Sequence, residues 1–301
     1  MATQKMFVDQ FADRIVEALE KGIAPWQMEW KAGEIVAPFN PATGKRYSGV
    51  NLVTLAGRQM ETGSADPRYM TAKQAKDNGL QIREGAKGAS IQYWQVRQKG
   101  RPLAGIATVF HASEIEGMPP LDAAKKPSVA FSEERMESML RNARVNIVHE
   151  DTDRCYYRVS DDTIHVSPIE NYQVWNAEGD YYATTLSGLV LASGHPERMN
   201  RPFSPKGSEA SASEQLRTEI ARWMLSADMG LPFEPGRQTD VNLWVENVKK
   251  DPHEIIRACR DAEKIVSYVK GLEHGHELSD EQKAEYKAAS AGLESAREGF
   301  A

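Results

Sequence analysis

The sequence predicts an α+β fold in two domains: a small sheet with helices in the N-terminal half, and a helix-rich C-terminal half. A chain of 301 residues is long enough for two hydrophobic cores, and 41% hydrophobic with 27% charged residues is a globular composition. Stretches of helical and of alternating apolar spacing occur in both halves. The segment GMPPLDAAKKPS separates the halves, so we place the domain boundary near residues 120–128.

The N-terminal half begins with an amphipathic helix that Gly22 and Pro25 end. Its apolar stripe consists of Phe7, Phe11, Ile15, Ala18 and Leu19. A segment punctuated by Pro and Gly follows and is expected to form an ordered surface loop. The pattern then changes to period two from Leu80, which predicts a hairpin. Helices are therefore expected at residues 6–21, 51–61 and 72–78, and strands after residue 88 and at 103–111.

The C-terminal half is expected to open with a helix capped by Ser132. Longer helices are predicted at residues 180–193, 211–229 and 252–272, and short strands at 155–159 and 163–166. The last residues are polar, with few large apolar side chains, which is typical of a frayed or mobile helix. The predicted domains are residues 1–125 and 126–273, with a polar tail at 274–301.

Two features of the composition exclude whole classes of protein. No run approaches the roughly 20 apolar residues that cross a bilayer, and the first residues contain acidic side chains where a signal peptide would be apolar. We therefore expect a cytoplasmic protein without membrane contact. The two cysteines, Cys155 and Cys259, lack CxxC spacing, which indicates buried free thiols rather than a disulfide or a zinc site.

The charge is unevenly distributed along the chain. The formal net charge is -6, yet residues 31–99 contain 11 Lys and Arg against 5 Asp and Glu. A local basic surplus allows a nucleic-acid partner for this segment, although charge alone favours a solvated basic face without a ligand.

Cations and aromatic side chains alternate within this basic segment. Lys and Arg neutralise phosphates, and flat rings stack on unpaired bases, a combination suited to sequence-tolerant binding of single strands. The candidate phosphate contacts are Lys31, Lys45, Arg46, Lys73, Arg83 and Lys87. The candidate stacking rings are Tyr47 and Trp94, with Trp30 as a third; for each, a core position is the alternative. Trp26, beside Pro25, is predicted to be structural.

Four separated motifs of the N-terminal half resemble one known family. They are EKGIAPWQMEWK, NPATGKRYSGVN, YMTAKQAKDNGLQIREGAKGASIQYW and VFHASEIEGMP. In order and spacing they are similar to the N-terminal domain of the plasmid antirestriction ArdC family, which also stands at the front of some conjugation primases. The resemblance implies a single-stranded DNA-binding module. It also implies protection of incoming mobile-element DNA, with a host defence protein as a second candidate partner.

The stretch YYATTLSGLVLASGHPERMNR resembles the metal-binding helix of that family's zincin-like metallopeptidase domain, YYATLFHELxHWTGHxxRLNR. The frame is retained, including His195. Ser187 and Leu191, however, stand where the zinc-binding histidines belong, and Gly188 stands where the glutamate general base belongs. HExxH requires two imidazoles on one helix face and a carboxylate between them.

The family's third ligand is a glutamate on a later helix, and its position here corresponds to Gln215, which we favour, or Glu219. Neither serine nor leucine replaces an imidazole as a zinc ligand. The sequence therefore predicts no metal, no cofactor and no peptidase activity.

Two alternative functions stay open. One is a metallopeptidase with an unconventional ligand set drawn from His165, His195, Glu214 and Glu219. The other is an acidic protein that inhibits a nuclease by imitating DNA, prompted by the net negative charge. The acidic residues of the C-terminal half are interspersed with Lys and Arg, which argues against this mimic.

Overall fold

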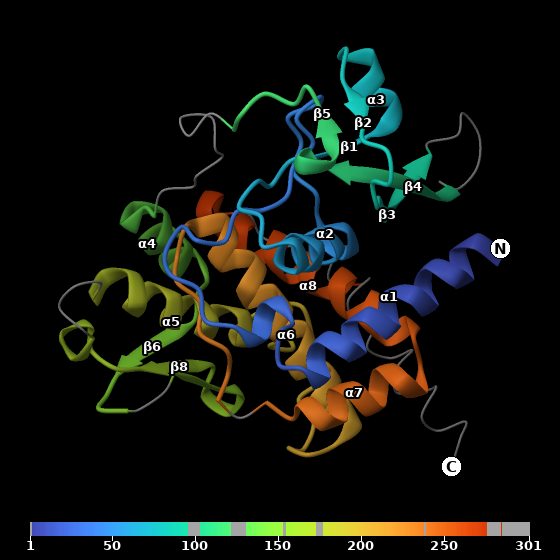
Figure 1. The fold of residues 1–301 in the computed structure, drawn as a ribbon. Coiled ribbons are helices and arrows are strands. Elements are labelled where there is room, and N and C mark those ends of the chain that lie inside the picture. Colours follow the sequence, from blue (N-terminus) through green and yellow to red (C-terminus); the bar gives the residue numbers. More distant parts are fainter. Residues whose placement is uncertain are drawn as a thin grey trace.

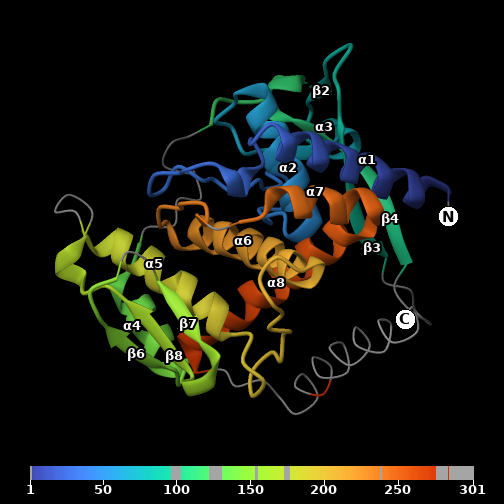
Figure 2. The same cartoon turned by 90° about the horizontal axis from the view of Figure 1, so that it is seen from below.

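The computed structural model describes residues 2–95, 103–121, 131–152, 155–172, 177–237 and 239–275, together with Ala284. It has the α+β architecture that the sequence predicts, with a sheet and helices in the N-terminal part and a helix-rich C-terminal part. None of the described helices combines the length and apolar character that spanning a bilayer requires. Figures 1 and 2 place the two three-stranded sheets at opposite ends of the molecule, with helices between them.

The N-terminal part contains helices α1 (Ala2–Glu20), α2 (Gly49–Thr62) and α3 (Ala72–Asp77) and a 3-10 turn, η1 (Pro25–Gln27). Its sheet has the order β1-β4-β3, formed antiparallel by β1 (Tyr69–Thr71), β4 (Leu103–His111) and β3 (Ala89–Gln95). A second ladder pairs β2 (Gln81–Ile82) with β5 (Ile115–Glu116), which follows the 3-10 turn η2 (Ala112–Glu114). Helix α2 covers one face of the main sheet, where Leu55 packs against Tyr69 and Val109.

The C-terminal part contains helices α4 (Glu133–Asn142), α5 (Ala177–Ala192), α6 (Glu209–Met229), α7 (Val241–Lys250) and α8 (His253–Gly271). Its sheet has the order β6-β8-β7, formed by β6 (Asn146–His149), β8 (Thr163–Val166) and β7 (Tyr156–Arg158). Strand β8 runs parallel to β6 and antiparallel to β7. Ile164 of β8 is fully buried against α5, so the sheet is held directly on the helix that carries the degenerate motif.

One hydrophobic core joins both parts of the molecule. Helix α1 packs on α7 and α8, and α2 packs on α8 (Figures 1 and 2). Trp26 is 1% exposed within this shared core, which confirms the prediction that it is structural. The N-terminal helices are thus packed onto the C-terminal part, and the domain boundary at 120–128 stays a prediction, since residues 122–130 lie outside the described ones.

The predicted helices are all present among the described residues, and the predicted hairpin is formed by β3 and β4. The strands β1, β2, β5 and β6 and the helix α7 were not predicted. Helix α7 begins where the Asp240 side chain accepts a hydrogen bond from the Leu243 amide, at 3.2 Å. Strands β1 and β6 are three and four residues long, too short for an alternating pattern to stand out. Both cysteines are free: Cys259 is fully buried and Cys155 half-buried. The predicted tail lies outside the described residues, apart from positions 274, 275 and 284.

Candidate functional site

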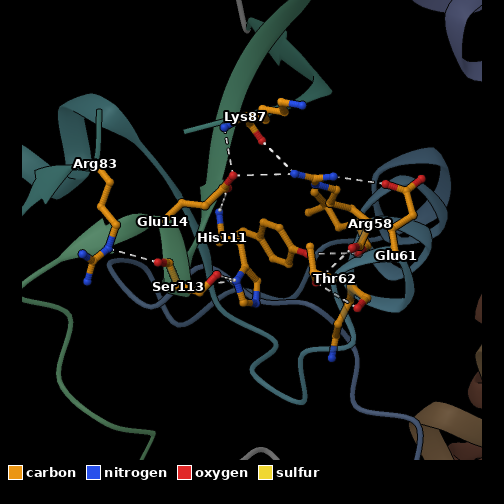
Figure 3. A network of polar contacts seen from close by, with 11 residues as sticks. Arg58, Glu61, Thr62, Arg83, Lys87, His111, Ser113 and Glu114 are labelled. Carbon is orange, nitrogen blue, oxygen red and sulfur yellow. Dashed lines mark hydrogen bonds and ion pairs between the residues drawn. The ribbon is translucent and has the colours of Figure 1, made fainter. Parts of the chain in front are cut away.

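A network of polar contacts around Glu114 organises the N-terminal surface (Figure 3). The Glu114 carboxylate accepts hydrogen bonds from the backbone amides of Lys87, at 2.9 Å, and His111, at 3.1 Å. The Arg58 guanidinium of α2 lies 3.6 Å from the same carboxylate and donates to the Lys87 carbonyl at 3.4 Å. The loop 83–88 is therefore tied both to the end of β4 and to α2.

The His111 side chain is 1% exposed and lies beside this network, at the end of β4. Its Nε2 lies 2.7 Å from the Asp66 carbonyl oxygen, and its Nδ1 accepts a hydrogen bond from the Ser113 amide at 3.1 Å. Because a carbonyl oxygen only accepts, Nε2 is the ring nitrogen that donates in this network. The turn after β4 is thus fixed by a ring whose two nitrogens both have partners.

Three of the sequence-predicted cations project from this framework. Lys87 is exposed, and Figure 3 shows its ammonium pointing away from Glu114. Arg83 is also exposed, and its Nε donates to the Ser113 carbonyl at 3.2 Å. Lys73 is exposed on α3, which packs against β2, the strand that leads into the loop. We call Lys73, Arg83 and Lys87 the framework cations.

The earlier loop, residues 30–47, faces the C-terminal part instead. Trp30 and Phe233 exchange two backbone hydrogen bonds, each of 2.9 Å. The Arg46 guanidinium lies 3.1 Å from the Asp228 carboxylate of α6, which also pairs with Lys270 at 2.6 Å. Lys31 and Lys45 are exposed. The predicted phosphate contacts thus divide into two groups, and Arg46 belongs to an internal ion-pair network.

The aromatic candidates of that loop are also engaged. Tyr47 is half-buried against the core of the small sheet, its hydroxyl donates to the Tyr69 carbonyl at 3.1 Å, and burial raises its pKa to about 12. The Trp30 indole donates to the Pro25 carbonyl at 2.8 Å. These contacts favour structural roles over open stacking faces. The side chain of Trp94 lies outside the described residues.

The glycine at the start of α2 faces an acidic group. Gly49 has a φ of 53°, and a Cβ built on it would lie 2.6 Å from Oε2 of Glu263 in α8. The Glu263 carboxylate therefore stands against the positive end of α2, where its charge is stabilised by the helix dipole. A phosphate would be repelled there, so the start of α2 is not a site for a DNA phosphate.

In the C-terminal part, the retained arginines of the motif close the end of α5. Arg198 donates to the Ala192 carbonyl at 2.7 Å and pairs with Asp162. Arg201 donates to the Val190 carbonyl at 2.6 Å and pairs with Glu214 of α6. The last carbonyls of a helix lack intrahelical partners, so these arginines stabilise the turn that carries His195.

Two of the candidate ligand positions, Ser187 and Glu219, contact an arginine that the sequence reasoning missed. Arg222 of α6 donates from Nε to the Ser187 hydroxyl of α5 at 2.8 Å. Its Nη1 donates to Glu219 at 2.6 Å, and Glu219 is 6% exposed. Ser187 also donates to the Ala183 carbonyl at 2.9 Å, so its hydroxyl is held by two hydrogen bonds. Ser187 and Glu219 are thus joined by a guanidinium.

Gly188 lies where α5 and β8 approach most closely. A Cβ at this position would stand 2.6 Å from Cγ2 of Ile164 and 3.0 Å from Sγ of Cys155. Burial raises the pKa of the Cys155 thiol to about 12, so it is protonated at neutral pH. The site at which a general base would project is therefore filled by strand residues.

The other candidate ligands are dispersed. Gln215 contacts Ser211 and the Asp240 amide, each at 3.4 Å. His195 accepts from the Glu197 amide at 3.2 Å within its turn, and His165 lies 3.1 Å from Glu150 on the sheet. Leu191 is half-buried. Within the described ranges, no three His, Cys, Asp or Glu side chains are grouped as metal ligands would be.

Two family models match the chain. One describes the N-terminal domain of anti-restriction factor ArdC and matches residues 5–124, and the other describes a zincin-like metallopeptidase and matches residues 134–261. The chain belongs to the ArdC-type antirestriction family. Both parts of the ArdC-type architecture are therefore present, the N-terminal domain and the zincin-like part.

Solved structures and curated relatives agree with this assignment. The metal-free crystal structure of antirestriction protein ArdC from plasmid R388 has a TM-score of 0.73 and 26% identity, covering 90% of this chain and 99% of that one. The Mn(II)-bound structure of the same protein has a TM-score of 0.70 with 26% identity, covering 88% and 97%.

Two DNA primases TraC of Escherichia coli are 39% and 36% identical to this chain over 90% and 91% of its length. The chain spans only 27% and 20% of those primases. An uncharacterized protein, y4eC of Sinorhizobium fredii (strain NBRC 101917 / NGR234), is 26% identical, covering 94% of this chain and 95% of its own length.

Proposed function

We propose that this ArdC-type protein binds single-stranded DNA through its N-terminal part and protects incoming mobile-element DNA from restriction. The observation that carries the proposal is the set of framework cations, which are exposed: Arg83 and Lys87 on the loop fixed by the Glu114 network, and Lys73 on α3, which packs against β2. Phosphate contacts to such cations are independent of base sequence. The binding is therefore sequence-tolerant.

The net charge of the chain restricts where a strand can bind. With a net charge of -6, most of the surface repels phosphates, and attraction is confined to locally basic regions. Asp228 and Glu263 make the start of α2 and the loop before it unfavourable for a phosphate. We therefore propose that the bound DNA strand runs along the loop 83–88 and α3. Lys31 and Lys45 could contact only one end of that strand.

We further propose that the zincin-like part has no peptidase activity. The residues present do not fit a catalytic metal: Ser187 is committed to Arg222, Leu191 has no donor atom, and Gly188 supplies no general base. The acidic candidates of the unconventional ligand set are neutralised by arginines, Glu214 by Arg201 and Glu219 by Arg222. This part serves as a scaffold on which the N-terminal helices pack.

The similarity to the TraC primases supports a role in conjugation, and a cytoplasmic location follows from binding transferred DNA. A host defence protein is the second proposed partner. The substituted ligand positions leave the C-terminal surface available for such a contact without peptidase chemistry.

Fluorescence anisotropy with a labelled, unstructured oligonucleotide tests the DNA proposal. We expect the full chain to bind it more tightly than a duplex of equal length, with an affinity that falls as salt rises. Absence of binding at low salt, or binding indifferent to salt, would refute the proposal. Metal content measured on protein purified without a His tag tests the second half: one tightly held equivalent would restore the metallopeptidase alternative.

A further inference from the structure

Arg222 occupies an unusual position for a charged side chain. It lies between α5 and α6, the two helices that supply metal ligands in the zincin arrangement, and only 18% of its side chain is exposed. Its guanidinium has partners from three segments: Ser187 on α5 at 2.8 Å, Glu219 on α6 at 2.6 Å, and the Glu234 carbonyl at 3.0 Å. Each of the three nitrogens is used once.

The charge balance at this position requires a cation. Glu219 is buried, with 8% of its side chain exposed, and its second oxygen accepts a hydrogen bond from the Gly236 amide at 3.3 Å. A buried carboxylate is costly without an opposite charge. Because Arg222 supplies that charge and saturates the surrounding oxygens, a metal ion beside it would meet like-charge repulsion and would lack ligands.

The same guanidinium also holds a segment that reaches the N-terminal part. Residues 231–236, which we call the strap, return along α6 after its last turn. Arg222 binds the strap carbonyl of Glu234, and its guanidinium carbon lies 5.5 Å from the centre of the Phe233 ring. Phe233 in turn exchanges two backbone hydrogen bonds with Trp30. The contacts thus run without a break from α5 to the N-terminal loop.

We infer that the Arg222 guanidinium takes the place of the family's metal ion as a built-in cation, which joins α5 to α6 and anchors the strap that docks the N-terminal part. The inference rests on the proposed absence of a catalytic metal centre. It goes further by naming the Arg222 guanidinium as the group that replaces the metal ion. It concerns positioning, since Arg222 contacts no substrate in this role.

Restoring the two imidazoles with and without Arg222 tests this inference. The first full-chain variant carries Ser187→His and Leu191→His, and the second adds Arg222→Met, which frees the Glu219 carboxylate, the alternative to Gln215 at the third-ligand position, to bind zinc. Both are purified without a His tag, dialysed against zinc and then against metal-free buffer, and their zinc content is measured. We expect about one equivalent of zinc in the second variant and none in the first.

The matched control replaces another buried arginine of the same helix. The Arg217 guanidinium pairs with Glu254 and Asp261, each at 3.0 Å, and is not bonded to Ser187. Arg217→Met removes this guanidinium. Added to the two histidine substitutions, it should leave the variant without zinc. Arg222→Met leaves the buried Glu219 carboxylate without a counter-charge until zinc binds, which could prevent folding. Arg222→Gln, whose amide still donates to Glu219, is therefore made in parallel.

Zinc uptake by the two-histidine variant with Arg222 in place, equal to that of the variant without it, would overturn the inference. So would a lack of zinc in folded variants that lack Arg222. Zinc in the wild-type chain would instead refute the proposed absence of a metal centre, so the two failures are distinguishable. Thermal melting with and without zinc supplies the second measurement: zinc should raise the Tm only where Arg222 has been removed.

Discussion

Arginine and lysine side chains serve opposite purposes in two regions of this molecule. On the N-terminal surface, Arg83 and Lys87 project from a loop whose backbone amides at both residues are bound to Glu114, while Nε of Arg83 donates to the Ser113 carbonyl. Between α5 and α6, the charge of Arg222 is paired with that of Glu219, and Ser187 and the Glu234 carbonyl accept its other hydrogen bonds. The first arrangement leaves charge for a partner, and the second leaves none.

The difference shows that the number of cations in a segment does not measure its ability to bind DNA. Arg46 belongs to the most basic segment of the chain, yet it pairs with Asp228 on α6. A phosphate must displace that carboxylate before it can bind, whereas within the described part of the chain no carboxylate pairs with the Lys87 ammonium. Burial and existing partners thus decide which cations are available.

The largest expected effect is that of Arg222→Met on stability. The substitution leaves the Glu219 carboxylate buried without a counter-charge, so the free energy of unfolding should fall by about 3–5 kcal/mol. Urea denaturation measures this change. Arg158→Ala, which removes an ion pair whose side chains are 48% and 46% exposed, should change the free energy of unfolding far less, because solvent screens that pair. Equal losses for the two variants would contradict the role given to Arg222.

A pair of helical glycines provides the next comparison. Gly188→Ala places a methyl group 2.6 Å from Ile164 and should lower the free energy of unfolding by about 1–3 kcal/mol. Gly57→Ala in α2 meets nothing within 4 Å and should raise it by about 0.5–1 kcal/mol, because glycine is unfavourable inside a helix. Tolerance of Gly188→Ala would mean that the space for a general base is still open.

Arg46→Ala should affect stability more than DNA binding. Its ion pair with Asp228 is partly exposed, at 33% and 20%, so the free energy of unfolding should fall by about 1 kcal/mol or less. Because the charge is already paired, the dependence of DNA affinity on salt should stay as in the wild type. A weaker salt dependence would place Arg46 among the phosphate contacts and remove the distinction between the two groups of cations.

The smallest expected effect is on acid stability. The pKa of Glu273 is lowered from its usual value of 4.5, mainly because Arg135 donates two hydrogen bonds to the carboxylate, at 2.9 and 3.0 Å. A lowered pKa stabilises the fold above the unfolded-state value, and this contribution is lost as the pH falls through the folded-state pKa. Arg135→Ala should therefore cost less than about 1 kcal/mol at pH 7, since the pair is partly exposed.

The difference between Arg135→Ala and the wild type should shrink below about pH 4.5, because Glu273 is then becoming protonated in both. Urea denaturation at pH 7 and pH 3.5 measures it. A difference that stays constant or grows on acidification would show that the pair does not contribute through the charge of Glu273.

The helices and the substituted motif could be predicted from sequence because their signals are local. Ser132 accepts a hydrogen bond from the Arg135 amide as an N-cap, and Gly63 takes the left-handed conformation after α2, with a φ of 62°. Ser187, Gly188 and Leu191 were identified because the stretch around them resembles the metal-binding helix of the family. These features depend on residues within about one or two helical turns of each other.

The partners that decide function could not be predicted because they are distant in sequence. Arg46 meets Asp228 across 182 positions, and Arg222 meets Ser187 across 35. The available signal for Arg222 was its place three residues after Glu219 on a predicted helix, which allows an ion pair between them. Only tertiary packing then shows that the pair spans the former ligand positions.

The most direct test of the availability of the framework cations is the slope of log affinity against log salt for a single-stranded oligonucleotide. We expect the combined substitution Lys73→Ala, Arg83→Ala and Lys87→Ala to reduce that slope by about 2, since each single-strand phosphate contact contributes about 0.7. An unchanged slope in a folded triple variant would contradict the account, because the strand would then be bound elsewhere.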